Sequence, residues 1–268
     1  MKKIQILESF HLKIIAMVIM VIDHIAAYII PYSSPWYLPL RCLGRISFPL
    51  FAFMVVEGIH HSKKPLMYLL RLFILGIIID LGTLIALGSY PGCVLTTFVF
   101  GGLIVYCLEK LKGPYKLFSI LPFTIFFLSG FDFFPLRMQY GVYGVTTILI
   151  FYLAKPITMF LSKIISNYGL DYDEYVKSPN FRLFYSLIAT SIFMVFNMLC
   201  AKFAYQINSF FTANDVSFTV QTYSAFACVF IILYNGKRGY NAKWFQYGSY
   251  LFFPLQFVLI YLIKLLFF

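Results

Sequence analysis

Charged residues are scarce in this sequence of 268 residues. Only 12% are Asp, Glu, Lys or Arg, whereas 61% are hydrophobic, and the mean hydropathy is +0.85. Soluble globular domains carry about 25% charged residues, so this composition excludes that class. It is typical of a protein that lies in a lipid bilayer.

Motifs that bind metals are also lacking. The five cysteines form no C-x-x-C pair and show no paired spacing, which argues against a zinc site and against a disulfide framework. Glu57, His60 and His61 do not reproduce the H-E-x-x-H spacing of zinc enzymes. We therefore expect no bound metal.

Long apolar runs dominate instead. Several reach about 18 residues, enough at roughly 1.5 Å per residue to cross a hydrocarbon core of about 30 Å. Continuous runs favour helices over the alternating strands of a membrane barrel. No linker separates two parts, so residues 1–268 are expected to form one all-α transmembrane domain. Its nine expected spans are 12–31, 41–60, 66–88, 93–110, 115–131, 141–165, 182–206, 217–234 and 249–267.

The basic residues indicate an orientation. With the N-terminus in the cytoplasm, the 21 Lys and Arg residues lie on the cytoplasmic side apart from Arg41, Arg45, Arg137, Lys202 and Lys264. This bias follows the positive-inside rule, and it accounts for the net charge of +11 without a nucleic-acid partner. We expect a multi-pass protein of the cell membrane with the lipid bilayer as its partner; the sequence does not indicate an oligomeric state.

Asp23 and His24 interrupt the first expected span. An ionisable group at the centre of such a helix costs about 2.5–3.5 kcal/mol, so each is a functional candidate. Arg45 in the second span lies at a comparable depth, and its guanidinium suits a carboxylate or a bound anion. Asp23 and Arg45 are therefore either a structural ion pair or part of a site. An imidazole can both accept and donate a proton near neutral pH.

The second span holds further polar residues. Arg41 shares a face with Arg45, and Pro49 is expected to bend the helix because it cannot donate to the carbonyl of Arg45. Near the cytoplasmic end, Glu57, His60 and His61 form either an interfacial charge cluster or part of a cofactor site. Lys63 is a further candidate for binding the cofactor.

Other candidates lie later in the chain. Asp80 is a second carboxylate deep in an expected span, and Tyr143 belongs to the segment YGVYG that opens the sixth. The turn LYNGKRGY contributes Asn235, Lys237 and Arg238. These donors suit phosphate groups, or they serve as an ordinary cytoplasmic anchor.

In order and spacing, six segments resemble the TraX family of polytopic membrane proteins: LKIIAMVIMVIDHIAAYI, LRCLGRISFPLFAFMVVEGIHHSKK, YLLRLFILGIIID, YGVYGVTTILIFYL, LYNGKRG and FFPLQFVLIYLI. TraX is known as the acetylase of the F-pilus pilin N-terminus. The family is also distantly similar to transmembrane acyltransferases that use cytosolic acetyl-CoA. The resemblance implies a membrane-bound N- or O-acetyltransferase with acetyl-CoA as the donor substrate. The implied acceptor is an amine or hydroxyl of a pilin N-terminus, a surface glycan or a peptide.

The resemblance also implies roles for single residues. His24 would be the catalytic base, with Asp23 tuning the site and Arg45 or a helix terminus stabilising the oxyanion. Asp80 stands where relatives usually have Glu. Gln256 departs from the family pattern, because relatives commonly read F-Y-P-x-H at this point. Two other functions stay open: a proton-coupled small-molecule transporter, and a non-catalytic membrane component of a conjugation or secretion apparatus.

Overall fold

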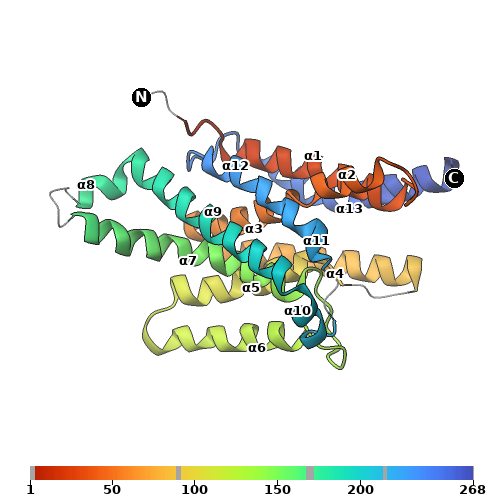
Figure 1. Cartoon of the computed structure of the whole chain (residues 1–268), viewed down its shortest axis with the longest axis horizontal. Coiled ribbons are helices and arrows are strands. Elements are labelled where there is room, and N and C mark those ends of the chain that lie inside the picture. The colour runs from red at the N-terminus through yellow and green to blue at the C-terminus, as the bar shows by residue number, and fades with distance from the viewer. Residues whose placement is uncertain (1–3, 89–91, 167–171, 214–215, 268) are drawn as a thin grey trace. The chain divides into compact units, whose positions relative to one another are not determined.

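The computed structural model describes residues 4–88, 92–166, 172–213 and 216–267, and its regular elements in these ranges are helices (Figure 1). It has no strand there, only an isolated bridge between Leu7 and Tyr234. The expected all-α class is confirmed. The helical elements are α1 (Ser9–Tyr28), α2 (Tyr37–Gly44), α3 (Ser47–His61), α4 (Pro65–Leu87), α5 (Val94–Lys110), η1 (Gly113–Ser119), α6 (Ile120–Leu128), α7 (Gly141–Ser166), α8 (Tyr172–Lys177), α9 (Pro179–Lys202), α10 (Ala204–Phe210), α11 (Phe218–Gln221), η2 (Thr222–Phe226), α12 (Ala227–Ile232) and α13 (Lys243–Phe267).

Six helical segments in the described ranges are long and apolar enough to cross a membrane. The other three expected spans are helical but shorter: α5 has 17 residues, and the remaining two are Gly113–Leu128 and Phe218–Ile232. Such helices measure about 25 Å or less, short of a hydrocarbon core of about 30 Å. The expected count of nine is therefore not confirmed, and the orientation stays a prediction. The six long segments are Ser9–Tyr28, Tyr37–His61, Pro65–Ile85, Gly141–Ile165, Pro179–Lys202 and Lys243–Leu266.

The chain divides into two compact units that are each discontinuous in sequence. Helices α3, α7, α9 and α11 contribute residues to both. The expected single domain over residues 1–268 stays a prediction. Unit 1 comprises Met1–Phe51, Leu153–Met198 and Thr219–Phe268, and unit 2 comprises Ala52–Tyr152 and Leu199–Phe218.

In unit 1, α1 packs against α2 and α13 (Figure 1). The second expected span is broken, since α2 ends at Gly44 and α3 begins at Ser47. Pro49 then stands in the first turn of α3, where a missing N–H is tolerated. The Ser47 hydroxyl donates to the carbonyl of Ala16 over 2.8 Å and fixes the start of α3 against α1. A Cβ at Gly44 would meet the side chain of Asp23, so glycine permits the close approach of α2 to α1.

The segment before α1 is bonded to the turn after α12, also within unit 1. The N–H of Leu7 donates to the carbonyl of Leu233 over 2.9 Å, and the carbonyl of Leu7 accepts from the N–H of Asn235 over 2.8 Å. The N–H of Ser9 donates to the carbonyl of Lys237 over 2.9 Å. These bonds join the start of the described chain to the turn between α12 and α13.

Unit 2 is built around α5, which packs against α4, η1 and α6. Its apolar core contains Ile104, Phe126 and Val145. Gly101 lies against Ile148, whose Cδ1 is 2.5 Å from the place that a Cβ would take. Gly101 therefore lets the Ile148 side chain of α7 pack directly onto the backbone of α5.

Candidate functional site

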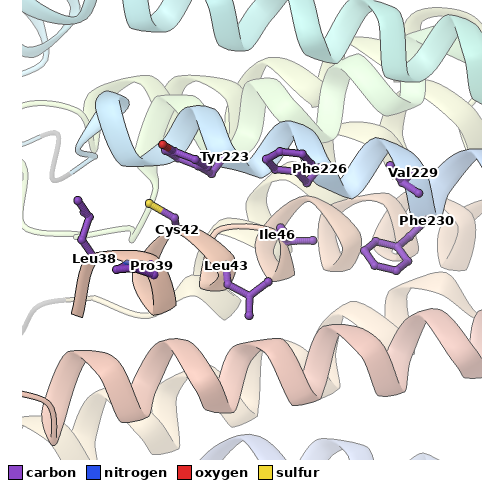
Figure 2. A pocket seen from close by; sticks show the side chains of 9 residues that line it. All are labelled: Leu38, Pro39, Cys42, Leu43, Ile46, Tyr223, Phe226, Val229 and Phe230. Carbon is purple, nitrogen blue, oxygen red and sulfur yellow. The ribbon is translucent and has the colours of Figure 1, made fainter. Parts of the chain in front are cut away.

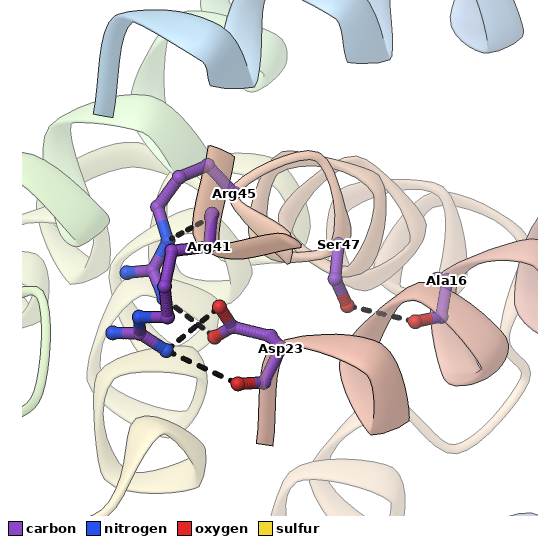
Figure 3. A network of polar contacts seen from close by, with 5 residues as sticks. All are labelled: Ala16, Asp23, Arg41, Arg45 and Ser47. Carbon is purple, nitrogen blue, oxygen red and sulfur yellow. Dashed lines mark hydrogen bonds and ion pairs between the residues drawn. The ribbon is translucent and has the colours of Figure 1, made fainter. Parts of the chain in front are cut away.

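One carboxylate and two guanidinium groups form a buried ionic network in unit 1 (Figure 3). Arg41 Nη1 lies 2.7 Å from Asp23 Oδ1, and Arg45 Nη2 lies 2.5 Å from Asp23 Oδ2. Arg41 Nη1 also donates to the backbone carbonyl of Asp23 over 3.3 Å, and Arg45 Nε donates to the carbonyl of Arg41 over 3.3 Å. The structure thus pairs Arg45 with Asp23 and adds Arg41 to the pair.

Local sequence explains this network. Arg41 and Arg45 are four residues apart, which puts both side chains on one side of the chain where α2 ends. The close approach at Gly44 brings that side to Asp23 on α1. The side chains of Asp23 and Arg45 are only 11% and 14% exposed, and three formal charges sum to +1. A carboxylate held by two cations is a stable arrangement for a charge taken out of water.

His24, the next residue of α1, points into a different environment. Its ring lies against Phe257 of α13, with centroids 4.4 Å apart, and near Phe253 and Tyr28 at 6.5 and 6.2 Å. Successive helical residues point about 100° apart, so the imidazole of His24 points away from the ionic network of Asp23. Within the described chain Asp23 bonds the arginines and not His24, so it does not orient the ring by a direct hydrogen bond.

Gln256 of α13 is the polar side chain beside His24. Its carboxamide is close enough to interact with the imidazole. Yet neither Oε1 nor Nε2 of Gln256 completes a hydrogen bond of ordinary geometry within the described residues, and His24 Nδ1 does not either. Gln256 is only 4% exposed. The structure therefore brings together two sequence-predicted residues that stand near opposite ends of the chain.

Glu57 and His60 lie in unit 2, at the end of α3. Glu57 Oε2 is 3.5 Å from His61 Nε2, one helical turn away. His60 Nε2 is 3.9 Å from Glu109 Oε2 of α5, and Lys110 Nζ donates to the carbonyl of His60 over 3.2 Å. Glu57, His60 and His61 thus lie in a cluster of polar contacts that Glu109 and Lys110 extend. Its interfacial position stays a prediction.

The other candidates of unit 2 are dispersed. Lys63 is exposed after the end of α3. Asp80 is buried in α4 and close enough to Cys93 to influence its thiol. Tyr143 is buried at the start of α7, where its ring packs near that of Phe218 with centroids 6.1 Å apart. The structure does not gather these three side chains into one site.

The turn with Asn235, Lys237 and Arg238 belongs to unit 1. Its backbone carbonyls accept hydrogen bonds from the segment before α1, and the Asn235 side chain accepts from the N–H of Lys237 over 2.8 Å. Both basic side chains are exposed. The amide of Asn235 therefore shapes the turn, while the two cations face outward and stay accessible to an anion.

Arg182 was not among the residues selected from the sequence, although it borders this turn. Its guanidinium lies over the ring of Tyr234 at 4.5 Å and over that of Tyr185 at 5.2 Å. Its Nε is 3.4 Å from the place that a Cβ of Gly236 would take, and Gly236 has a φ of 79°. Nothing in the sequence links α9 to this turn, because only tertiary packing brings them together.

An apolar groove runs beside α2 in unit 1 (Figure 2). It has a volume of about 640 Å³. Its lining is aliphatic and aromatic, which suits an acyl chain or an apolar helix rather than a charged ligand. None of the residues selected from the sequence lines it. Its walls are Leu38, Pro39, Cys42, Leu43 and Ile46 on one side and Tyr223, Phe226, Val229 and Phe230 on the other.

Membrane-length helices with a buried ionic network and a half-buried imidazole define a polytopic helical membrane protein with polar side chains inside its apolar helices. The sequence profile described as "TraX protein" matches residues 9–165, which is more than half of the chain. The chain belongs to the TraX family. The match contains Asp23, His24, Arg41 and Arg45 but ends before Arg182 and Gln256.

A curated relative gives a second comparison. The chain is 28% identical over 170 residues to the "Probable fimbrial assembly protein FimC, serogroup H1" of Dichelobacter nodosus. The aligned part covers 61% of this chain and 70% of that protein. No solved structure matches the chain.

Proposed function

We propose that this protein is a membrane-bound acetyltransferase that moves an acetyl group from acetyl-CoA to an amine or hydroxyl of an acceptor. A pilin N-terminus, a surface glycan and a peptide are the candidate acceptors. The observation that carries the proposal is the position of His24. It is a base inside a membrane-length helix, screened by aromatic rings, next to a second polar side chain, and not engaged by the neighbouring carboxylate.

His24 would act as a general base. Its imidazole takes the proton of the acceptor amine or hydroxyl while the nitrogen or oxygen bonds to the thioester carbonyl carbon. The carbon–sulfur bond then breaks, and the departing thiolate of coenzyme A takes the proton back from the imidazolium. The acceptor ends acetylated, the thiol is free, and His24 returns to its starting state.

The donor would approach from the side where cations are accessible. Lys237 and Arg238 are exposed on their turn, and Arg182 is held beside it by two tyrosine rings. Its positive charge adds to those of Lys237 and Arg238 at this turn, and a guanidinium suits the geometry of a phosphate. In unit 2, the basic end of α3 with Lys63 offers a second surface for phosphate groups. A cytoplasmic N-terminus would place these cations on the side that contains acetyl-CoA.

The test is acetyl transfer by purified protein in liposomes. Radiolabelled acetyl-CoA is supplied with a peptide that has a free N-terminal amine, or with a monosaccharide, and both labelled product and released thiol are measured. A general base contributes about 10²–10⁴-fold, so His24→Ala should lose at least about 100-fold in rate. His11→Ala is the matched control, because His11 is an exposed histidine of the same helix. Full transfer by His24→Ala would overturn the assignment.

The relative's name favours a second candidate function. That protein is called a probable fimbrial assembly protein, so this chain would be a non-catalytic membrane component of an assembly apparatus. Such a component should keep its function in cells that carry His24→Ala at normal expression. An acetyltransferase should lose its function with that substitution.

A further inference from the structure

Gln256 presents unused hydrogen-bonding capacity to the site of His24. The carboxamide can donate through Nε2 and accept through Oε1, and neither atom has a hydrogen-bond partner of ordinary geometry in the described residues. The side chain is more than nine-tenths buried. Buried polar atoms are nearly always bonded, so an unbonded donor and acceptor at one place indicate a ligand that bonds them.

The surroundings restrict what that ligand offers. The rings of Phe253 and Phe257 pack on each other with centroids 5.5 Å apart and lie on His24, so the nearest walls are apolar. The ligand must supply its own acceptor for Nε2 next to the imidazole. A carbonyl oxygen does so, and its acceptor strength rises when negative charge develops on it during attack.

We propose that Gln256 is a catalytic residue that binds the acetyl group beside His24, with Nε2 donating to the carbonyl oxygen of the thioester. This inference rests on the proposed acetyltransferase function. When the acceptor attacks the carbonyl carbon and His24 takes its proton, the charge on the oxygen is held by the Nε2–H of Gln256. The oxygen lone pair then re-forms the carbonyl double bond, and the electron pair of the carbon–sulfur bond leaves with the thiolate of coenzyme A. Oε1 then accepts from a remaining N–H of an acceptor amine.

Arg45 is less suited to that role than the sequence suggested. Its guanidinium is engaged with Asp23 over 2.5 Å and with the carbonyl of Arg41. To bind an oxyanion it would have to weaken those bonds. Gln256 is neutral and borders the imidazole, so its Nε2 can turn to an oxyanion without breaking an ion pair.

The inference is tested with Gln256→Leu in the liposome assay. Oxyanion donors contribute about 10²–10³-fold to kcat, so turnover should fall by about 100-fold or more with little change in the KM for acetyl-CoA. Leucine removes two unbonded buried polar atoms, so the melting temperature should not fall. Gln256→His keeps an N–H donor and should recover part of the rate. Gln246→Leu on the same helix is the control and should keep full activity.

The outcomes separate this inference from the proposed function. Wild-type transfer combined with undiminished turnover in Gln256→Leu overturns the role of Gln256 and leaves the acetyltransferase in place. Loss of turnover together with a lowered melting temperature also overturns it, because the side chain is then structural. A wild type that transfers no acetyl group to either acceptor overturns the proposed function and this inference with it.

Discussion

Removing the charge of Asp23 should destabilise unit 1 strongly. In Asp23→Asn the two guanidinium groups that now lie 2.7 and 2.5 Å from the carboxylate face a neutral amide. Two like charges then share a site in which the Arg45 side chain is 14% exposed and that of Arg41 is 24% exposed. Breaking a buried pair by removing one partner costs about 3–5 kcal/mol, whereas an exposed pair contributes about 0–1 kcal/mol.

The partial exposure of Arg41 places the expected loss near the lower end of that range, at about 3 kcal/mol. For a chain of this size that corresponds to a fall of roughly 6–12 °C in melting temperature. The assay is thermal unfolding of the purified protein in detergent, followed by the fluorescence of its two tryptophans and checked by size-exclusion chromatography. Both readouts should shift together if the loss is global.

Two further variants sharpen the comparison. Asp132→Asn removes a carboxylate from the exposed pair with Arg137, whose atoms are 2.9 Å apart, and should change the melting temperature little. Adding Arg41→Gln to Asp23→Asn removes one of the two stranded charges and should restore part of the lost stability. Equal melting temperatures for the wild type and Asp23→Asn would show that the network carries no net stability and would refute the reasoning.

Three more outcomes are expected. Gly44→Ala places a Cβ against the carboxylate of Asp23 and should cost about 1–3 kcal/mol in thermal unfolding. Gly248→Ala has open space around it and should be neutral or slightly stabilising. Equal effects of the two substitutions would contradict the close approach of α2 to α1. The hydrogen bond from Arg137 lowers the pKa of Asp132 below its usual 3.8. The small stability that Asp132 adds is therefore present above pH 3.8, and it is lost as the pH falls through the lowered pKa. This stability is measured as the difference in melting temperature between the wild type and Asp132→Asn at two pH values. A difference that grows as the pH falls would contradict the prediction. Arg182→Gln should raise the KM for acetyl-CoA about tenfold at unchanged kcat, as the loss of one charge-assisted bond to a phosphate predicts, and an unchanged KM would exclude that contact.

The sequence predicted the helical segments well, because the apolar runs are long and continuous. The expected count of nine membrane spans is not confirmed, because only six helical segments in the described ranges reach membrane length. Gly113–Leu128 and Phe218–Ile232 are apolar, but the start of the first and the middle of the second are 3₁₀-helical, which hydropathy alone does not reveal. A bend was expected near Pro49, since a missing N–H acts locally, and the structure has a break between α2 and α3 just before it.

The contacts of the candidate site were likewise predicted only in part from the sequence. The pairing of Asp23 with Arg45 follows from depth along two consecutive helices, and both residues are near in sequence. Gln256 stands at the other end of the chain, and no periodicity connects it to His24. Arg182 was likewise hidden, because its place beside the turn depends on α9 packing against residues after α12. Sequence patterns predicted contacts between consecutive helices. Contacts between helices far apart in the sequence depend on tertiary packing and were not predicted.

The contact between His24 on α1 and Gln256 on α13 has a consequence for biosynthesis. A ribosome that adds about 5–20 residues per second produces α13 roughly 10–50 s after α1. Throughout that interval the imidazole has neither the carboxamide nor the rings of Phe253 and Phe257 beside it. The partners of Asp23 are synthesised much sooner, because Arg41 and Arg45 follow shortly after α1 in the sequence. The nascent protein can therefore pair its buried carboxylate early, whereas the surroundings of His24 are completed only when the last long helix has been made.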